Sequence, residues 1–191
     1  MFFDDTISLP QLFHTLKQEL RRPLDDKGHP FRFLTLSTSA QGVPEARWVV
    51  LRDVDEQLNF YIFSDFRTRK TEDLKQNPNA TLLFYDDNQK LQIRLKGQVK
   101  PHHQNEVTNR YWKTVTGKAK RAYGSSIAPG SPVSRPEEAH QWPDEIGDDY
   151  FCVVQFSTMS IDALQLHKLS HYRALFSLKQ GDLAHSEWIA P

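Results

Sequence analysis

Short apolar runs separated by polar turns recur along most of the chain. They predict strands at residues 31–39, 46–51, 58–63, 80–85, 91–99 and 150–156. Short strands at this spacing favour an antiparallel barrel over a doubly wound parallel sheet. No G-x-G-x-x-G segment is present, so a dinucleotide-binding fold has no support. The expected fold class is mainly β (α+β), a barrel with flanking helices.

Helical spacing of apolar residues predicts three helices, at about 9–22, 68–76 and 102–114. Ser8 is a suitable N-cap for the first helix, and Gln11 completes a capping box. Thr68 is the expected N-cap of the second helix, which Asn77-Pro78 ends. At least the first helix is expected to lie on the sheet.

The C-terminal third combines a long loop with short strand-like pieces. Residues 124–136 are rich in Ser, Pro and Gly, and an apolar strand follows them, so they form a loop rather than a linker between domains. Further along, pieces at 174–178 and 188–190 flank a turn at 180–182. We expect a single domain over residues 1–191, with residues 163–191 as a strand tail.

Composition narrows the function classes. The 191 residues are 38% hydrophobic and 25% charged, which is typical of a globular chain. Lys+Arg and Asp+Glu number 24 each, and this zero balance argues against a general nucleic-acid binder. No apolar run is long enough to cross a bilayer and no secretory leader pattern begins the chain, so we expect a cytoplasmic protein. Cys152, the single cysteine, lies in an apolar run and is expected to be a small buried hydrophobe.

Basic and hydroxyl side chains gather between Arg47 and Lys70, where two predicted strands lead into a helix. Arg67, Arg69 and Lys70 crowd the start of that helix beside Thr68. Cations at a helix start oppose the helix dipole, so a bound anion would offset them, and the free N–H groups there suit a phosphate. An array of solvated surface ion pairs is the alternative.

Three motifs follow one another within residues 30–115. They are the strand RWVVLR at 47–52, the loop SDFRTRK at 64–70 and the strand LQIRLKG at 91–97. Each motif is weak alone, but their order and spacing are specific. Together they resemble the flavin-binding core of the pyridoxamine 5′-phosphate oxidase-like superfamily. The resemblance implies an FMN-binding split barrel of six antiparallel strands in Greek-key order, assembled as a homodimer with FMN at the subunit interface.

The resemblance also implies which residues bind FMN. Most of them come from the two strands and the helix start described above. They are Arg47, Trp48, Val49, Val50, Ser64, Asp65, Arg67, Thr68 and Lys70, with Gln92 from a later strand. The cations and hydroxyls would hold the phosphate and ribityl chain, since the arginine fork suits phosphate oxygens. The backbone from Arg47 to Val50 would run along the flavin ring, and Gln92 would hydrogen-bond its polar edge.

The implied activity is that of a flavin-dependent oxidoreductase acting on a small amine or another small reduced substrate. The implied substrate contacts are Arg52, Tyr111, His171 and Arg173. Authentic pyridoxamine phosphate oxidases follow the tyrosine with an Arg and a Ser that help hold the substrate phosphate, whereas this chain has Val115 and Ala119. That departure keeps open a second hypothesis, a non-catalytic flavin or tetrapyrrole carrier or sensor on the same fold.

Other chemistry has little support in the sequence. His167 and His171 share the spacing of one helix face, but no third ligand is near, so no metal site is expected. No G-x-S-x-G motif occurs. We assign no catalytic residue, because a bound cofactor would carry the difficult electronic step. A protein-interaction module whose charges serve no ligand is the third hypothesis.

Overall fold

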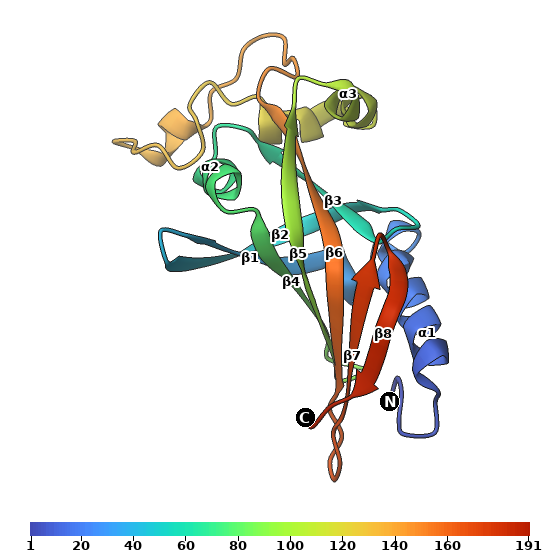
Figure 1. Ribbon diagram of the computed structural model, residues 1–191. Coiled ribbons are helices and arrows are strands. Elements are labelled where there is room, and N and C mark those ends of the chain that lie inside the picture. Colours follow the sequence, from blue (N-terminus) through green and yellow to red (C-terminus); the bar gives the residue numbers. More distant parts are fainter.

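Eight antiparallel strands form one sheet in the computed structural model, which describes residues 1–191 (Figure 1). The strands are β1 (Phe33–Ala40), β2 (Val43–Val54), β3 (Asn59–Asp65), β4 (Asn79–Asp86), β5 (Leu91–His103), β6 (Phe151–Gln165), β7 (Tyr172–Lys179) and β8 (Asp182–Trp188). Their order is β3-β2-β1-β4-β5-β6-β7-β8, and β3 also pairs with β6. This extra pairing closes β1 to β6 into a six-stranded antiparallel barrel, which confirms the predicted fold. Strands β7 and β8 extend the sheet beyond the barrel.

Strand β6 serves both the barrel and the extension. Its first half pairs with β3 as far as Ser157, and its second half pairs with β7 from Ser160 onward. Between these halves the register with β5 shifts, so that Met159 bulges opposite Lys96 and Gly97. A bulge bends its strand and increases the local twist. The bulge therefore lets β6 leave one sheet partner for another.

Gly97 lies beside this bulge, where β5 and β6 approach closely. A Cβ added at Gly97 would lie 2.1 Å from the Ser157 carbonyl oxygen and 2.7 Å from the ring of Phe156. Rotating a side chain cannot relieve the first contact, because the oxygen belongs to the backbone. The position therefore requires glycine on steric grounds.

Helices lie at both ends of the barrel. Helix α1 (Leu9–Arg21) begins at the predicted capping box, which Ser8 and Gln11 form. Helices α2 (Arg69–Gln76) and α3 (Glu106–Trp112) follow β3 and β5, and short 3₁₀ turns occupy Arg22–Leu24, Pro30–Arg32, Gly117–Tyr123 and Pro136–Ala139. Figure 1 shows α1 beside β8 and the other two helices toward the opposite end of the sheet. None of the helices combines the length and the apolar character needed to span a bilayer.

Two apolar clusters hold these elements together. The larger one fills the barrel and includes Leu12, Leu16 and Leu20 of α1, all fully buried. Burying one such side chain contributes about 1.5–3 kcal/mol, so α1 is firmly attached. The smaller cluster surrounds α3 and consists of Tyr61, Tyr111, Val115, Tyr123, Phe151 and Val153. Cys152 is fully buried as expected, and burial raises the pKa of its thiol to about 12.

Some element boundaries differ from the sequence prediction, because strand pairing extends farther than local patterns indicate. Strand β5 continues to His103, so α3 begins at Glu106 rather than at residue 102. Strand β6 runs past residue 156 to Gln165, since its second half pairs with both β5 and β7. The last strand ends at Trp188 instead of beginning there, because its residues pair with β7.

Candidate functional site

Strands β2 and β3 pair over only part of their length. β2 pairs with β1 from Val43 to Val50, but with β3 only from Leu51 to Val54. The edge of β2 that faces β3 therefore lacks a strand partner at residues 48–50, and unpaired edge backbone can hydrogen-bond a ligand. On β3, Ser64 and Asp65 pair only with β6. The two strands thus form a fork that opens toward the start of α2.

A depression of about 290 Å³ lies at the open end of this fork. Its walls come from three parts of the chain: Glu45 and Arg47 of β2, residues 68–70 and Asp73 of α2 and its N-cap, and Pro129 with Gly130 of the long loop. Figure 1 shows that loop, in orange, beside α2. The structure therefore brings together Arg47, Thr68 and Lys70, which were predicted to hold a phosphate.

Arg47 and Lys70 are partly buried cations without an ion-pair partner. Arg47 donates hydrogen bonds to the Leu36 carbonyl (3.2 Å) and the Thr38 hydroxyl (2.7 Å), and both acceptors are neutral. Burial lowers the pKa of Arg47, and burial followed by repulsion from Arg47 lowers the pKa of Lys70. Attraction to the charges of Glu45 and Asp73 raises the pKa of Arg47 but offsets the lowering by burial only in part. A bound anion would relieve the mutual repulsion and stabilise both charged forms.

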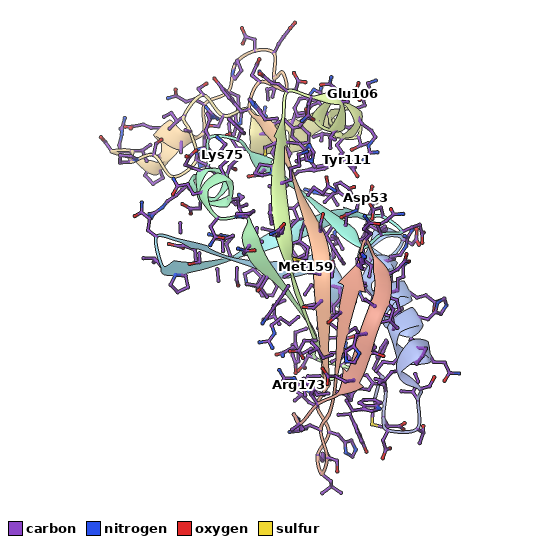
Figure 2. All side chains as sticks on the ribbon, in the orientation of Figure 1. Asp53, Lys75, Glu106, Tyr111, Met159 and Arg173 are labelled. Carbon is purple, nitrogen blue, oxygen red and sulfur yellow. The ribbon has the colours of Figure 1, made fainter.

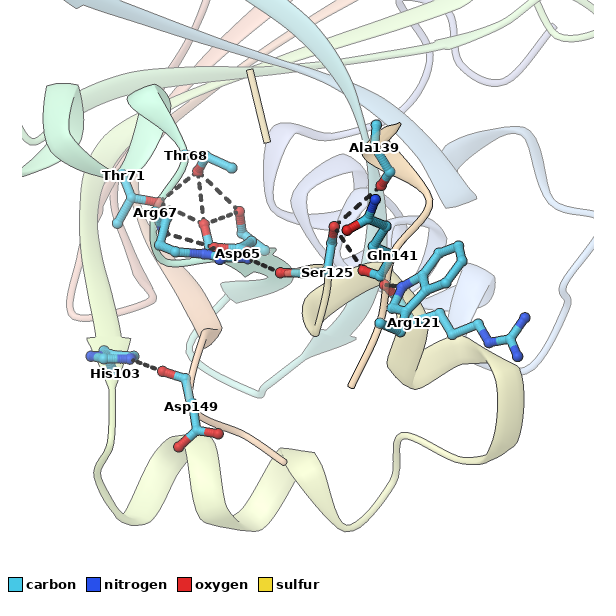
Figure 3. A network of polar contacts seen from close by, with 12 residues as sticks. Asp65, Arg67, Thr68, Thr71, His103, Arg121, Ser125, Ala139, Gln141 and Asp149 are labelled. Carbon is cyan, nitrogen blue, oxygen red and sulfur yellow. Dashed lines mark hydrogen bonds and ion pairs between the residues drawn. The ribbon is translucent and has the colours of Figure 1, made fainter. Parts of the chain in front are cut away.

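Arg67 does not line the depression, although it was predicted to bind the phosphate. Its guanidinium pairs with the Asp65 carboxylate (2.7 Å) and donates to the Ser125 carbonyl (2.7 Å) (Figure 3). It also lies over the Tyr150 ring at 3.4 Å. The hydrogen bond to Asp65 raises the pKa of Arg67. Asp65, also a predicted FMN ligand, is thus engaged with Arg67. Together the two residues tie the turn between β3 and α2 to the long loop.

Thr68 occupies the N-cap position of α2, but its hydroxyl accepts no hydrogen bond from a backbone N–H of the helix. It donates instead to the Asp65 carbonyl (2.8 Å) and lies 3.4 Å from the Ser64 hydroxyl. The predicted N-cap position is therefore confirmed, but the hydroxyl engages a backbone acceptor ahead of the helix instead of a helix N–H. The Thr71 N–H donates to the Thr68 carbonyl (2.9 Å), so the N–H groups of Arg69 and Lys70 are the ones that can hydrogen-bond an anion.

Arg69 also lines the depression, although it was not among the predicted cofactor ligands. Its side chain is largely exposed, and its ion pair with Asp73 is long, at 4.0 Å. The available signal was its place at the first position of a helix, beside Lys70. Arg69 therefore takes the place in the depression that was expected of Arg67.

A second pocket, of about 390 Å³, adjoins the fork where β2 and β3 begin to pair. It brings together two predicted substrate contacts, Arg52 and Tyr111. Tyr111 donates to the Asp53 carboxylate (2.7 Å), and burial followed by this hydrogen bond raises the pKa of Tyr111. Arg52 donates to the Tyr123 hydroxyl (3.3 Å). Figure 2 shows Asp53 and Tyr111 close together at this end of the sheet.

Arg32 lines the same pocket and was not among the residues predicted from the sequence. It lies in a 3₁₀ turn ahead of β1 and belongs to none of the motifs, so no local signal pointed to it. Val115 and Ala119 also contribute to the wall. Their side chains offer no hydrogen-bond donor.

Gln92 lies on a different part of the sheet. Strands β1 and β4 separate its strand, β5, from β2, which places Gln92 three strand spacings, about 14 Å along the sheet, from Val50. Gln92 is half-buried and pairs in register with Tyr85 and Leu164. One chain therefore does not bring Gln92 to the fork.

Arg173 and His171 lie at the far end of the molecule. Arg173 forms two hydrogen bonds of 2.9 Å with the Asp162 carboxylate, which also binds Arg94. His171 is exposed, and its Nδ1 accepts from the backbone N–H of His167 at 3.1 Å. Figure 2 shows Arg173 and Tyr111 toward opposite ends of the structure. Within one chain, the predicted substrate contacts thus form two separate groups.

Comparison with known families gives a match over most of the chain. Residues 18–143 match the family described as pyridoxamine 5′-phosphate oxidase. A pyridoxine/pyridoxamine 5′-phosphate oxidase from Microcystis aeruginosa is 34% identical over 110 residues, which cover 55% of this chain and 51% of that relative. Relatives of the same description from Paraburkholderia phymatum and Burkholderia cenocepacia are matched over 31% and 55% of their own length. The chain therefore spans about half or less of the relatives that it matches.

Two solved structures share the fold over nearly the whole chain. A pyridoxamine 5′-phosphate oxidase-related, FMN binding protein from Nostoc punctiforme has a TM-score of 0.74 at 21% identity and covers 97% of this chain and 100% of its own. PhzG from Burkholderia lata, in complex with tetrahydrophenazine-1-carboxylic acid, has a TM-score of 0.72 at 17% identity, with coverages of 98% and 95%. At these identities the likeness concerns the fold.

Proposed function

Because this chain belongs to the pyridoxamine 5′-phosphate oxidase family, we propose that it binds FMN and acts as a flavin-dependent oxidoreductase. The substrate class of this proposal is a small amine or another small reduced molecule. The observation that carries it is the pair Arg47 and Lys70, two partly buried cations with no carboxylate partner at the mouth of the fork. A phosphate in the depression would accept charged hydrogen bonds from both.

The residues around the depression fit the tail of FMN. Arg47, Arg69 and Lys70 would bind the phosphate, with hydroxyl groups from Ser64 and Thr68 close by. The unpaired edge of β2 at residues 48–50 would hydrogen-bond the flavin ring through its backbone. Pro129 and Gly130 would shield the phosphate from water. Arg67 would act indirectly, because it holds the loop that carries this wall.

When bound, FMN would supply a redox centre that takes two electrons from the substrate and gives them to an acceptor. The task of the chain is to orient the substrate and exclude water. The pocket beside the fork suits this task. Leu51 of its wall directly follows Val50 along the chain, and Phe63 of its wall directly precedes Ser64. A substrate held in the pocket would therefore lie next to the proposed ring position.

We also propose that two copies of the chain share the flavin at a dimer interface. The outer face of the sheet exposes Trp48 by 72%, Met159 by 55%, Phe33 by 54% and Tyr85 by 44%. Trp48 pairs in register with Thr35, and Thr35 with Leu83, so these side chains share one face of adjacent strands. An apolar patch of this kind is typical of an interaction surface. A second copy packed there would explain why Gln92 lies away from the fork of its own chain.

Flavin titration tests the cofactor proposal. Dialysed protein should take up FMN, quench its fluorescence and become yellow. Riboflavin, which lacks only the phosphate, should bind at least a hundredfold more weakly, because it cannot contact Arg47 and Lys70. A protein that binds neither flavin, or both equally, would contradict the proposal. Anaerobic mixing with a panel of amines then separates an oxidoreductase, whose flavin is bleached, from a carrier or sensor, whose flavin stays oxidised.

Sedimentation analysis tests the dimer. Trp48→Glu places a charge on the apolar face and should give monomers with weakened FMN binding. Val133→Glu, in the exposed long loop, is the matched control and should leave the dimer intact. Wild-type protein that sediments as a monomer when loaded with FMN would refute the shared site.

A further inference from the structure

The pocket beside the fork carries an inference about substrate class, which rests on the proposed function. We propose that this pocket binds an aromatic monocarboxylate and prefers it to a phosphate ester. The charges, the free donors and the walls of the pocket come largely from Arg32, Arg52, Asp53, Phe63, Tyr111 and Tyr123.

The charge balance of the lining matches a single negative charge. Arg32 and Arg52 are the cations, and neither forms an ion pair, whereas the ion pairs of other arginines in the chain involve partners outside this pocket. Asp53 is the one carboxylate, and both its oxygens are occupied, by the Val54 N–H (2.8 Å) and by the Tyr111 hydroxyl (2.7 Å). The lining therefore has one uncompensated positive charge. A dianion would leave one negative charge unmatched beside Asp53.

The charged hydrogen-bond donors of the pocket are planar, and several neutral donors are already engaged. The Tyr111 hydroxyl donates to Asp53, and the Thr114 hydroxyl donates to the Tyr111 carbonyl (2.7 Å), so neither is free. Tyr123 accepts from Arg52 and keeps its own proton for a ligand. The Thr116 hydroxyl also lines the pocket and forms no hydrogen bond within the protein, whereas the side chains of Val115 and Ala119 offer no donor. The two guanidinium groups are the charged donors, and their planar forks match a planar carboxylate.

The walls of the pocket suit an aromatic ring. Phe63 lies 5.4 Å from Tyr111 and 6.3 Å from Tyr123, measured between ring centroids, so three rings surround one side of the space. Arg52 lies over the Phe63 ring at 5.4 Å, which places its charge next to the aromatic wall. Ring pairs in tilted or edge-on contact stabilise one another, and a planar ligand would add to this cluster. A volume of about 390 Å³ accommodates a molecule of two or three fused rings.

Binding of three matched probes to FMN-loaded protein tests the proposal. The probes are 2-naphthoate, the neutral isostere 2-naphthamide and 2-naphthyl phosphate, measured by calorimetry. We expect 2-naphthoate to bind at least tenfold more tightly than 2-naphthamide and several-fold more tightly than 2-naphthyl phosphate, since a charged hydrogen bond commonly contributes a factor of ten or more. Equal affinity for the acid and the amide, or a preference for the phosphate ester, would overturn the proposal.

Variants connect that preference to this pocket. Arg52→Gln and Arg32→Gln should each weaken 2-naphthoate about tenfold and leave 2-naphthamide unchanged. Arg121→Gln removes the same charge from a side chain that lies over Trp142 outside the pocket, and it should change neither probe. Ala119→Lys adds a cation at an exposed wall position and should shift the preference toward 2-naphthyl phosphate. If the ratio of the affinities for 2-naphthoate and 2-naphthamide stayed unchanged in both arginine variants, the site would be refuted.

The visible spectrum distinguishes this proposal from the proposed function. Protein that takes up FMN but treats the acid and the amide alike retains the cofactor proposal and loses the substrate proposal. Protein that takes up no FMN, measured before any probe is added, refutes the proposed function and with it this inference.

Discussion

Two groups of cations on this sheet differ in how their charge is balanced. On β5 and β7, Arg94 and Arg173 converge on Asp162, which is 6% exposed and hydrogen-bonded to both. At the mouth of the fork, Arg47 and Lys70 lie close enough to repel each other and have no carboxylate partner. In the first group each cation has a carboxylate partner within the protein. In the second group neither cation forms an ion pair.

This difference bears on how a binding site can be recognised. A carboxylate between two arginines needs no ligand to explain it, because removing one member of a buried ion pair destabilises the protein. Cations that are half-buried without a partner cost stability, so their presence indicates a ligand that offsets the cost. Arg173, a substrate contact by resemblance, belongs to the first group and already has a structural task. Arg47 and Lys70 belong to the second.

The largest expected effect comes from removing the unbalanced charges. Arg47→Gln combined with Lys70→Gln should weaken FMN binding at least a hundredfold, because each charged hydrogen bond to a phosphate contributes about 1.5–3 kcal/mol. Fluorescence titration measures this loss. Lys75→Gln, which removes an exposed cation from the same helix, is the control and should change the affinity less than threefold. Tight FMN binding by the double variant would mean that the phosphate lies elsewhere.

Removing the carboxylate of Asp162, which balances Arg94 and Arg173, should reduce the stability of the protein rather than its binding of FMN. Asp162→Asn should lower the free energy of unfolding of the FMN-free protein by about 2 kcal/mol, because it leaves two arginines without their shared partner. Urea unfolding measures this change. Glu187→Gln, a half-exposed carboxylate on β8 outside this group, should have an effect below about 0.5 kcal/mol. Equal effects of the two substitutions would show that the paired group has no special part in stability.

The pH dependence of stability should separate the two groups by sign. Burial alone would raise the pKa of Asp162, but hydrogen bonds from Arg173 and Arg94 outweigh it and hold that pKa below its ordinary value of 3.8. A depressed carboxyl pKa contributes stability that is present above the unfolded pKa and is lost as the pH falls through the folded one. The difference in the free energy of unfolding between the wild type and Asp162→Asn should therefore be full at pH 7 and shrink below about pH 4. A difference that is constant from pH 7 to pH 3 would contradict this.

For Lys70 the pH dependence of stability should have the opposite sign, and the effect of its substitution should be the smallest of those predicted. Its lowered pKa means that folding disfavours its charged form at neutral pH, and that this penalty disappears as the pH rises through the folded pKa toward 10.5. Lys70→Met should therefore raise the stability of the FMN-free protein by about 0.5 kcal/mol while it weakens FMN binding. Thermal unfolding with and without FMN measures both quantities. A variant destabilised in both states would place Lys70 among the structural residues.

Local signals in the sequence were sufficient for much of the fold and part of the site. The short strands, the capping box at Ser8 and the helix after Thr68 each depend on neighbouring residues, and the structure has them. Arg47 and Lys70 lie in motifs whose order along the chain carried the resemblance. Their convergence follows because β2 and β3 are paired neighbours and α2 begins soon after β3.

What the sequence could not predict depends on contacts between distant segments. Arg67 binds the carbonyl of Ser125, 58 residues away, and no pattern near Arg67 signals that partner. Arg32 reaches the pocket only because a 3₁₀ turn precedes β1 at the correct place. The second half of β6 is a strand because β5 and β7 flank it, and its own alternation is interrupted by the bulge.

The close approach at Gly97 also has a consequence for how this protein can evolve and be engineered. Its neighbours Lys96 and Gln98 are exposed, and mutational drift or a combinatorial library can vary them with little penalty. Position 97 itself is closed to every other amino acid, since any of them would push one strand away from the next. Diversity in this part of the molecule is thus confined to surface positions, and a lineage that lost the glycine would have to rebuild the junction between barrel and extension.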